Sequence, residues 1–336
     1  MIPAAITPLL ELRAISKRFA TAPDLAARIA ARLGGGAGEQ AVHALDGVDL
    51  AVGAGEVVGL VGESGCGKST LGRIVARILE PSEGERRWKG RPYAEYEASA
   101  SRSERLAVQM VFQDPFASLN PRMRVADVIG EAPVVHGLVR ARERDAYVAD
   151  IMQRVGLDAG LARRFPHQFS GGQRSRIGIA RALAVKPRFL VCDEAVAALD
   201  VSIQAQVLNL FIRLREEFGL TYLFISHDLG VVRHLSDRVV IMYLGRIVES
   251  AGAGEVFARP NHPYTRALLA EVPTLAATKR AYVPIKGDIP SPLDPPRGCH
   301  FHPRCPHATA RCQAERPALR EIAPGHLSAC HLNDSP

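Results

Sequence analysis

The chain has 336 residues, of which 47% are hydrophobic and 23% charged, and its formal net charge at pH 7 is +7. This composition is typical of a soluble globular protein with one large or two modest domains. The sequence contains neither a membrane-length apolar run nor the pattern of a secretion signal, so we expect a cytosolic chain. The positive charge admits a nucleic-acid partner, but without a dense basic block direct nucleic-acid binding is the weaker interpretation.

The N-terminal part is predicted to form strands around a glycine-rich loop. Residues 9–19 read as a strand ending on Phe19, and residues 44–52 alternate apolar and polar residues like an edge strand. Residues 20–41 between them are rich in Ala and Gly, with a candidate short helix over 24–33. A buried strand over 57–61 then leads into the loop.

The loop has the form G-x-x-x-x-G-K-[S/T] and is followed by a helix that ends at Pro81. Glycines let successive backbone N–H groups point at phosphate oxygens, and the helix N-terminus adds partial positive charge. Lys68 can reach the outer phosphates, and Ser69 can bind Mg²⁺. A chance glycine turn is the alternative. The residues predicted to bind nucleotide are Gly62, Glu63, Ser64, Gly65, Cys66, Gly67, Lys68, Ser69 and Thr70.

Beyond this helix, strands and helices alternate. A polar passage runs to about residue 105, and residues 121–168 are mostly helical, with Pro133 and Pro166 as breaks. The remaining predicted elements are strands over 106–112, 188–192 and 220–225, helices over 173–185 and 201–218, and a hairpin over 238–249 around Leu244-Gly245. Alternation predicts a parallel α/β core. A Pro-rich composition from residue 283 indicates a second module.

Two further motifs indicate phosphate chemistry. Asp193 and Glu194 end an apolar strand, where an α/β sheet places ligand-binding groups; Asp193 could hold Mg²⁺ and Glu194 could polarise a water, unless both only cap a turn. Ser170 and Gln173 form an S-x-x-Q capping box. Capping does not explain Gly171 and Gly172 between them, which cost helix stability, whereas bare backbone at a helix start suits an anion. Two such sites suggest a nucleotide held from two sides.

The order of these motifs, with Gln113, Asp200 and His227 at their places, resembles the ATPase subunit of an ATP-binding-cassette (ABC) transporter. The resemblance covers residues 10–255. It implies a P-loop NTPase cassette over 9–255, with a mostly parallel central sheet, an antiparallel β subdomain and a helical subdomain over about 121–186. Residues 256–336 would form a C-terminal extension.

The resemblance also assigns roles. Two cassettes would pair head to tail, with Ser170, Gly171, Gly172 and Gln173 of one facing the ATP on the other. Asp193 and Ser69 would hold Mg²⁺, and Gln113 would sense the metal and the attacking water. Glu194 would be the catalytic base, His227 would hold the γ-phosphate, and Asp200 would cross the dimer interface. Phe19 would stack on adenine, with ordinary packing as the alternative. The sequence departs from the family pattern at Ser175, Ala195 and Ala197, without losing a phosphate, metal or base ligand.

Four stretches resemble ATPase subunits of dipeptide and oligopeptide importers, a branch that also serves nickel and other small solutes: residues 111–122, 200–207, 262–273 and 287–306. This implies a second ATPase subunit, two permeases and an external solute-binding protein, with this chain peripheral at the cytoplasmic face of the membrane. Residues 116–123 would face the permease, or form a plain loop. The alternative function is a soluble ABC ATPase acting on nucleic acid, which should carry a coiled coil or zinc insertion between 70 and 170; neither is visible.

The C-terminal part carries Cys299, Cys305, Cys312 and Cys330. The gaps between them are wider than the two to four residues typical of paired zinc ligands. Four thiolates suit a [4Fe–4S] cluster, and the resemblance associates similar tails with one. Zinc, with nearby histidines, and unligated thiols are the alternatives.

Overall fold

The computed structural model describes residues 7–20, 41–271 and 287–334. The candidate helix over 24–33 lies outside these residues. Two sheets build the described part: a four-stranded sheet in the order β2-β1-β4-β5 and an eight-stranded sheet in the order β11-β12-β10-β9-β3-β8-β7-β6. Their strands are β1 (Leu10–Ala20), β2 (Ala41–Val52), β3 (Val57–Val61), β4 (Glu83–Trp88), β5 (Arg91–Pro92), β6 (Val108–Val111), β7 (Phe189–Asp193), β8 (Thr221–Ile225), β9 (Arg238–Tyr243), β10 (Arg246–Gly252), β11 (Arg320–Ala323) and β12 (His326–Ser328).

The centre of the larger sheet is parallel, as predicted. Strand β3 pairs in parallel with β8 and β9, and β7 pairs in parallel with β6 and β8. Every residue of β3, β7 and β8 is buried, which explains their continuous apolar sequences, because helices cover both faces of such a sheet. The carboxyl ends of these strands therefore meet at one edge, where the predicted phosphate and metal groups lie.

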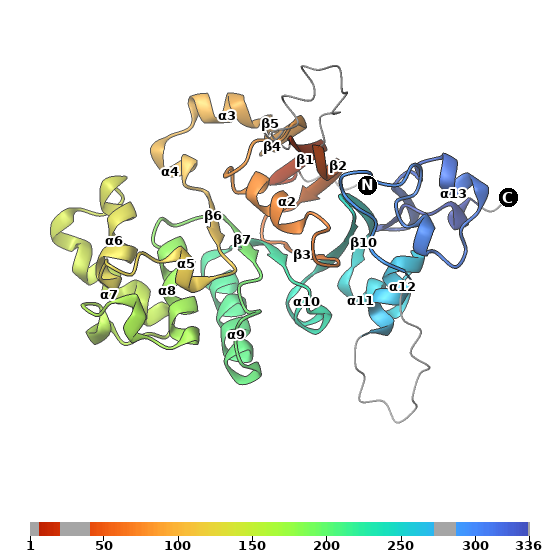
Figure 1. The fold of residues 1–336 in the computed structure, drawn as a ribbon. Helices are drawn as coiled ribbons and strands as arrows, with labels where there is room; N and C mark the ends of the chain where they lie inside the picture. Colours follow the sequence, from red (N-terminus) through yellow and green to blue (C-terminus); the bar gives the residue numbers. More distant parts are fainter. Residues whose placement is uncertain (1–6, 21–40, 272–286, 335–336) are drawn as a thin grey trace, which may run out of the picture.

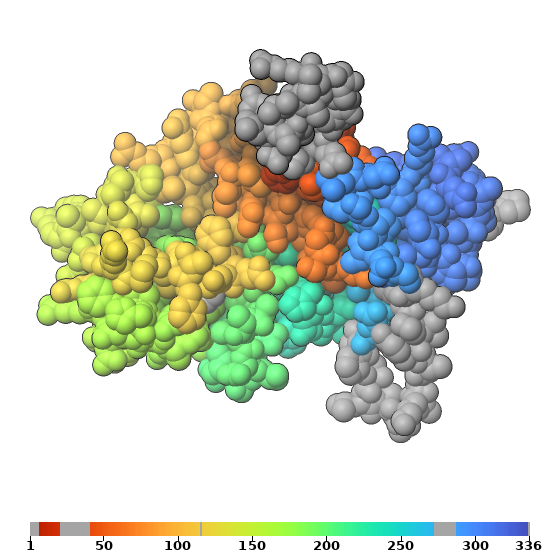
Figure 2. Space-filling view, viewed as in Figure 1, coloured from red at the N-terminus to blue at the C-terminus, as the bar shows by residue number. Residues whose placement is uncertain are grey.

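Helices cover the sheets and form a separate group at one end. The helices are α2 (Lys68–Val75), α3 (Tyr93–Ser99), α4 (Arg102–Arg105), α5 (Pro115–Ser118), α6 (Val125–Val135), α7 (Arg144–Arg154), α8 (Gly171–Leu183), α9 (Val201–Phe218), α10 (Leu229–Leu235), α11 (Ala253–Ala258), α12 (Pro263–Ala270) and α13 (Ala310–Ala314). Short 3-10 turns occupy Ala141–Glu143, Ala159–Leu161, Pro166–Gln168, His302–Arg304 and His331–Asn333. Helices α5 to α8 gather at the left of Figure 1, and the C-terminal residues lie at the opposite end; Figure 2 shows the same arrangement as a surface.

Several predicted elements differ from the structure. The helix after the glycine-rich loop, predicted to end at Pro81, is α2 and ends at Val75. The polar passage before residue 105 contains strand β4, which pairs with β1 and buries Trp88 completely. Pro133 does not end a helix, as predicted, but lies buried inside α6, which continues to Val135. Helix α8 begins at Gly171, not at residue 173, because Ser170 is its N-cap and both glycines belong to its first turn.

The C-terminal residues extend the main sheet. Strand β12 pairs with β10, with Ser328 opposite Glu249. The carboxylate of Glu249 is fully buried and accepts hydrogen bonds from the backbone N–H groups of Asn261 and His262 and from His326 Nε2, at 2.8 Å each. A buried carboxylate with three donors is satisfied, so this residue ties the C-terminal strands to the cassette core.

Candidate functional site

The phosphate loop follows β3 and opens α2. Gly65 and Gly67 have φ angles of 80° and 104°, in the left-handed region that favours glycine. A Cβ on Gly62 would overlap the backbone oxygen of Met242, and one on Gly67 would overlap that of Ala44. The loop is therefore packed closely against its neighbours. A curled backbone of this kind offers N–H groups to an anion, apart from those of Glu63 and Cys66, which donate within the protein.

Lys68 is the charged group of the loop. Its side chain is buried, and its Nζ donates to the backbone oxygens of Gly62 at 2.7 Å and Glu63 at 2.9 Å. Among the described residues, no carboxylate lies within ion-pair distance of this ammonium group. Its other partner is Cys66 Sγ, at 3.8 Å. A buried cation without a negatively charged partner suits a polyphosphate, whose charge would neutralise it.

Ser69 and Asp193 meet at the end of β7, as predicted. Ser69 Oγ donates to Asp193 Oδ1 at 2.9 Å, across 124 residues of sequence. Burial raises the pKa of Asp193, and the bond from Ser69 opposes that shift. A hydroxyl beside a buried carboxylate is an oxygen pair that fits Mg²⁺.

Glu194 is the centre of a second cluster. Its φ angle is +47°, a conformation that non-glycine residues rarely adopt and that occurs preferentially at functional sites. Gln113 Nε2 donates to Glu194 Oε2 at 2.7 Å, and His227 Nδ1 lies 3.4 Å from Glu194 Oε1. The structure thus brings together all three predicted catalytic side chains, next to Asp193.

The segment Ser170–Gln173 forms the capping box that the sequence predicts. Ser170 Oγ accepts from the Gln173 N–H, and Gln173 Oε1 accepts from the Ser170 N–H. Ser170 and Gly171 are exposed, so the start of α8 faces solvent. Figure 1 shows α8 among the helices at the left, whereas α2 lies over the central sheet. Within the described residues, no hydrogen bond joins this segment to the phosphate loop.

The structure gives the positions of several other predicted residues, and their roles stay predictions. Asp200 is the exposed N-cap residue of α9 and makes no side-chain cap bond. Phe19 has 39% of its surface exposed, with Lys17 Nζ 5.2 Å from its ring centre. Phe116 is 61% exposed, and the Arg174 guanidinium lies 3.7 Å from its ring centre. Two departures from the family pattern touch each other, because Ser175 Oγ donates to the backbone oxygen of Ala195.

The four C-terminal cysteines do not form a ligand set in this structure. Among the described residues, no group of three or more His, Cys, Asp or Glu side chains is arranged to hold a metal ion. Burial raises the pKa of the Cys299 thiol to about 11 and also raises the pKa values of Cys305 and Cys330, and the neighbouring cysteines add to each shift. This arrangement does not support the predicted [4Fe–4S] cluster.

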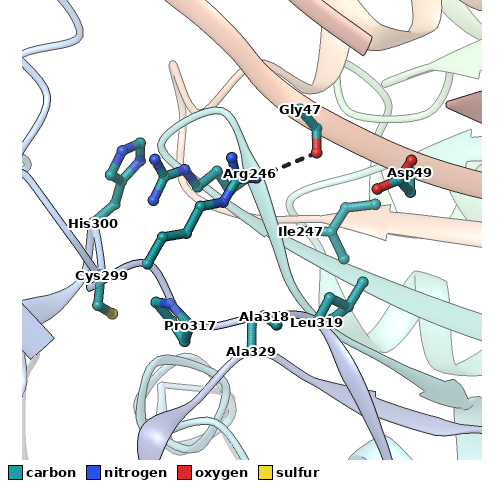
Figure 3. A pocket seen from close by; sticks show the side chains of 11 residues that line it. Gly47, Asp49, Arg246, Ile247, Cys299, His300, Pro317, Ala318, Leu319 and Ala329 are labelled. Carbon is teal, nitrogen blue, oxygen red and sulfur yellow. Dashed lines mark hydrogen bonds between the residues drawn. The ribbon is translucent and has the colours of Figure 1, made fainter. Parts of the chain in front are cut away.

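Sequence reasoning missed two contacts that reach the phosphate loop from the C-terminal part. Tyr264 Oη accepts a hydrogen bond from the Glu63 N–H at 2.9 Å, and Arg304 forms an ion pair with the Glu63 carboxylate. A cavity of about 400 Å³ lies beside this region, between β10 and the C-terminal segment, and is lined by Arg246, Cys299 and His300 (Figure 3). Tyr264 lies in the stretch 262–273, which in the sequence indicated only a resemblance to peptide importers and no contact with the loop.

Comparisons with known proteins agree with this geometry. Residues 45–197 match the family model "ABC transporter", and residues 248–312 match "Oligopeptide/dipeptide transporter, C-terminal region". The chain is 50% identical to the oligopeptide transport ATP-binding protein AppF of Bacillus subtilis, over 96% of this chain and 97% of that one. It is 44% identical to the dipeptide transport ATP-binding protein DppF of Haemophilus influenzae, over 96% of each chain.

Solved structures show the same fold. The ATP-binding cassette MJ0796, in a dimeric post-hydrolysis state bound to ADP and Pi, superposes with a TM-score of 0.60 at 25% identity and covers 73% of this chain and 98% of that one. CbiO1 of Clostridium perfringens gives a TM-score of 0.59 at 27% identity, covering 75% and 92%. Fold, site and full-length relatives agree: this chain is an ATPase that belongs to the ABC transporter family, in the group that carries the oligopeptide/dipeptide transporter C-terminal region.

Proposed function

We propose that this chain energises the import of dipeptides or oligopeptides, or of related small solutes, through a membrane permease. The observation that carries the proposal is the likeness to peptide-transport ATP-binding proteins over 96% of the chain, C-terminal region included. The alternative of an ATPase acting on nucleic acid receives no support from these relatives.

The site residues suggest how ATP would be cleaved. The loop N–H groups and Lys68 would bind the β- and γ-phosphates, which offsets charge on the transferred group. Mg²⁺ would neutralise phosphate charge, held by Ser69 and Asp193. Glu194 would accept a proton from the attacking water, with Gln113 orienting that water and His227 near the γ-phosphate. Phosphoryl transfer asks mainly for positioning of this kind.

Each such site would be shared between two subunits. The start of α8 presents exposed glycine backbone, and the likeness to a dimeric cassette supports a head-to-tail pair. In that pair Ser170–Gln173 would bind the γ-phosphate on the partner's loop, and Asp200 would lie at the interface. We infer that the partner is a second, different ATPase subunit.

The same proposal gives the remaining partners. Among the described residues, no helix has the length and apolar character needed to cross a bilayer. By the likeness to peptide-transport ATP-binding proteins, we infer that two permease subunits hold this chain at the cytoplasmic face of the membrane and that an external binding protein delivers the solute. The exposed ring of Phe116, close to Gln113 in sequence, supports residues 116–123 as the permease contact.

Reconstitution tests this function. The chain would be co-purified with a candidate partner ATPase and candidate permease subunits, and the complex would be placed in proteoliposomes with a candidate external binding protein. We expect ATP-dependent uptake of a labelled dipeptide or pentapeptide, abolished when Glu194→Gln replaces the native chain. Uptake of nickel without peptide would assign the system to another solute, and retention on DNA without permease binding would overturn the transport proposal.

Metal binding by the four cysteines is a separate proposal. We infer that the half-buried Cys299, Cys305, Cys312 and Cys330 could hold a [4Fe–4S] cluster or zinc. Two of them are neighbours in the structure, because the Cys299 N–H donates to the backbone oxygen of Cys312 at 2.8 Å. Protein purified without oxygen would be assayed for iron, sulfide and zinc, beside a Cys305→Ser variant. Stoichiometric iron and sulfide would support a cluster, and one bound zinc would support the alternative. Protein that contains neither metal would show that the thiols are unligated.

A further inference from the structure

The C-terminal segment, residues 298–304, binds the phosphate loop at Glu63. The Arg304 guanidinium donates to both carboxylate oxygens of Glu63, with Nη1–Oε2 at 2.7 Å and Nη2–Oε1 at 3.1 Å. The Arg304 side chain is only 6% exposed and that of Glu63 22%. A bidentate pair of this kind is among the stronger and more directional polar contacts in proteins.

Arg304 is held in place by an aromatic cluster. The rings of Tyr243, Tyr264 and Phe301 pack together, with centroids 4.7 to 5.4 Å apart. Arg304 Nη1 lies 3.4 Å from the Tyr243 hydroxyl, and the Tyr264 hydroxyl accepts from the Glu63 N–H. Both the backbone and the carboxylate of Glu63 are thus bonded from the C-terminal side, by side chains that are themselves buried.

A second connection reaches the other end of the loop. His300 Nδ1 donates to the backbone oxygen of Leu244 at 2.8 Å, in the turn between β9 and β10. The next residue of this turn, Gly245, donates its N–H to the backbone oxygen of Cys66 at 2.9 Å. Arg246 lines the same cavity as His300 (Figure 3), and it donates to the backbone oxygen of Gly298 at 2.7 Å. Residues 298–304 therefore contact the loop directly at Glu63 and are connected to Cys66 through the turn between β9 and β10.

Glu63 connects Arg304 to Lys68, the cation of the phosphate loop. Its backbone oxygen accepts from Lys68 Nζ, so the position of Glu63 helps to set that of the phosphate-binding ammonium. Its carboxylate lies in the loop that would surround a polyphosphate, and an unpaired negative charge there would repel the ligand. Arg304 neutralises this charge while leaving Lys68 free of a carboxylate partner.

We propose that Arg304 is a positioning residue of the nucleotide site, which orders the phosphate loop through Glu63 and cancels the Glu63 charge. The proposal rests on ATP binding at this loop and not on the solute that is transported. It predicts that the C-terminal segment acts first on nucleotide affinity, whereas the catalytic cluster around Glu194 is unaffected.

The test is nucleotide affinity in the full-length chain. Arg304→Gln is expected to weaken MgATP binding by about tenfold or more, which corresponds to about 1.4 kcal/mol, and to raise the KM for ATP of the assembled ATPase while kcat changes far less. Arg311→Gln is the matched control, because Arg311 pairs with Glu315 and Asp334 inside the same C-terminal extension and does not contact the loop. Arg304→Lys keeps the positive charge but cannot form the bidentate pair with Glu63. Its MgATP affinity should lie between those of the native chain and Arg304→Gln.

The double variant Glu63→Gln/Arg304→Gln separates this role from a merely structural one. Removing the unpaired carboxylate should recover part of the lost affinity, whereas loss of packing alone would leave the double variant as weak as Arg304→Gln. Thermal unfolding of each protein checks folding, and if Arg304→Gln does not fold, Arg304→Lys carries the comparison. An affinity equal to that of the Arg311→Gln control, a defect confined to kcat, or a double variant without recovery would each overturn the proposal.

Discussion

At the scale of single residues, the site depends on side chains that the fold holds in unusual settings. Glu194 adopts a left-handed backbone conformation, and its side chain is 17% exposed. Gln113 donates to one of its oxygens, and His227 lies near the other. The proposed role of Glu194 as the catalytic base rests on this fixed position beside Asp193, from which it would accept a proton without reorganising.

Replacing Glu194 by Gln should separate binding from hydrolysis. The variant keeps the size and the acceptor for Gln113 but cannot take a proton, so we expect ATP hydrolysis to fall by about 10²- to 10⁴-fold. MgATP affinity, measured by calorimetry, should stay close to that of the native chain. Glu216→Gln on the exposed face of α9 is the control. Near-normal turnover in Glu194→Gln would remove Glu194 as the base.

Two buried histidines should make stability depend on pH. Burial lowers the pKa of His262 to about 3 and that of His300 to about 4, with nearby arginines adding to both shifts. Their ordinary pKa is 6.5, so below that pH the unfolded chain binds more protons than the folded chain. The free energy of unfolding should therefore fall as pH drops from 6.5 towards 4, by about 1.4 kcal/mol per pH unit for each histidine.

Denaturant unfolding at several pH values tests this dependence. Asn at position 262 can still cap α12, and Asn at position 300 can still donate to Leu244, so His262→Asn/His300→Asn should fold. The double variant should show a shallower loss of stability below pH 6.5. The same slope in both proteins would mean that these histidines do not carry the effect.

At the scale of elements, helix α8 is built to present bare backbone. Gly171 and Gly172 occupy its first turn behind the Ser170 cap. A Cβ on Gly172 would overlap the Ile203 side chain, whereas one on Gly171 would meet only Leu199, at 3.9 Å. Packing therefore explains glycine at position 172, but it does not explain glycine at position 171.

Gly171→Ala tests whether the open position serves a partner's nucleotide. We expect the melting temperature to stay the same or rise slightly, because Ala favours a helix over Gly by up to about 1 kcal/mol. ATPase activity of the assembled complex should nevertheless fall by about tenfold or more, since a methyl group would separate the helix start from the γ-phosphate. Gly178→Ala, at an open position of the same helix, should leave activity unchanged. Full activity in Gly171→Ala would contradict the shared site.

At the scale of the whole molecule, the two halves of the proposed site lie on different parts of one chain. The phosphate loop sits on the central sheet, and the start of α8 lies with the helical group (Figures 1 and 2). The C-terminal residues join the same sheet through β12 and contact the loop through Arg304. The cassette and its extension are therefore one packed unit, which we propose binds ATP on its own loop and completes the site of a neighbouring subunit.

The isolated chain should bind ATP and hydrolyse it poorly. Specific activity should rise with protein concentration or on addition of the partner ATPase, because in the proposed shared site the partner would supply the second set of phosphate ligands. In light scattering, Glu194→Gln with MgATP should give a stable dimer with the partner, and nucleotide removal should dissociate it. A monomer that turns over ATP at the rate of the full complex would refute the shared site.

The sequence by itself determined the local chemistry of this protein. The loop at residues 62–70, the capping box at 170–173 and the carboxylates after β7 are contiguous patterns, so short-range physics predicts their conformation. The buried strands of the parallel core were equally visible, because burial on both faces leaves continuous apolar runs. Strand β4 was missed because its residues are mostly charged, and pairing with β1 overrides their low strand propensity.

Only the tertiary structure decided which distant residues share a site. Gln113 reaches Glu194 across 81 residues and Arg304 reaches Glu63 across 241. It also showed that the four C-terminal thiols, close as they are, do not form a metal ligand set among the described residues. Contacts of this kind depend on how sheets and helices pack, which no local pattern encodes. Sequence therefore predicts the phosphate loop, while packing determines what holds that loop in place.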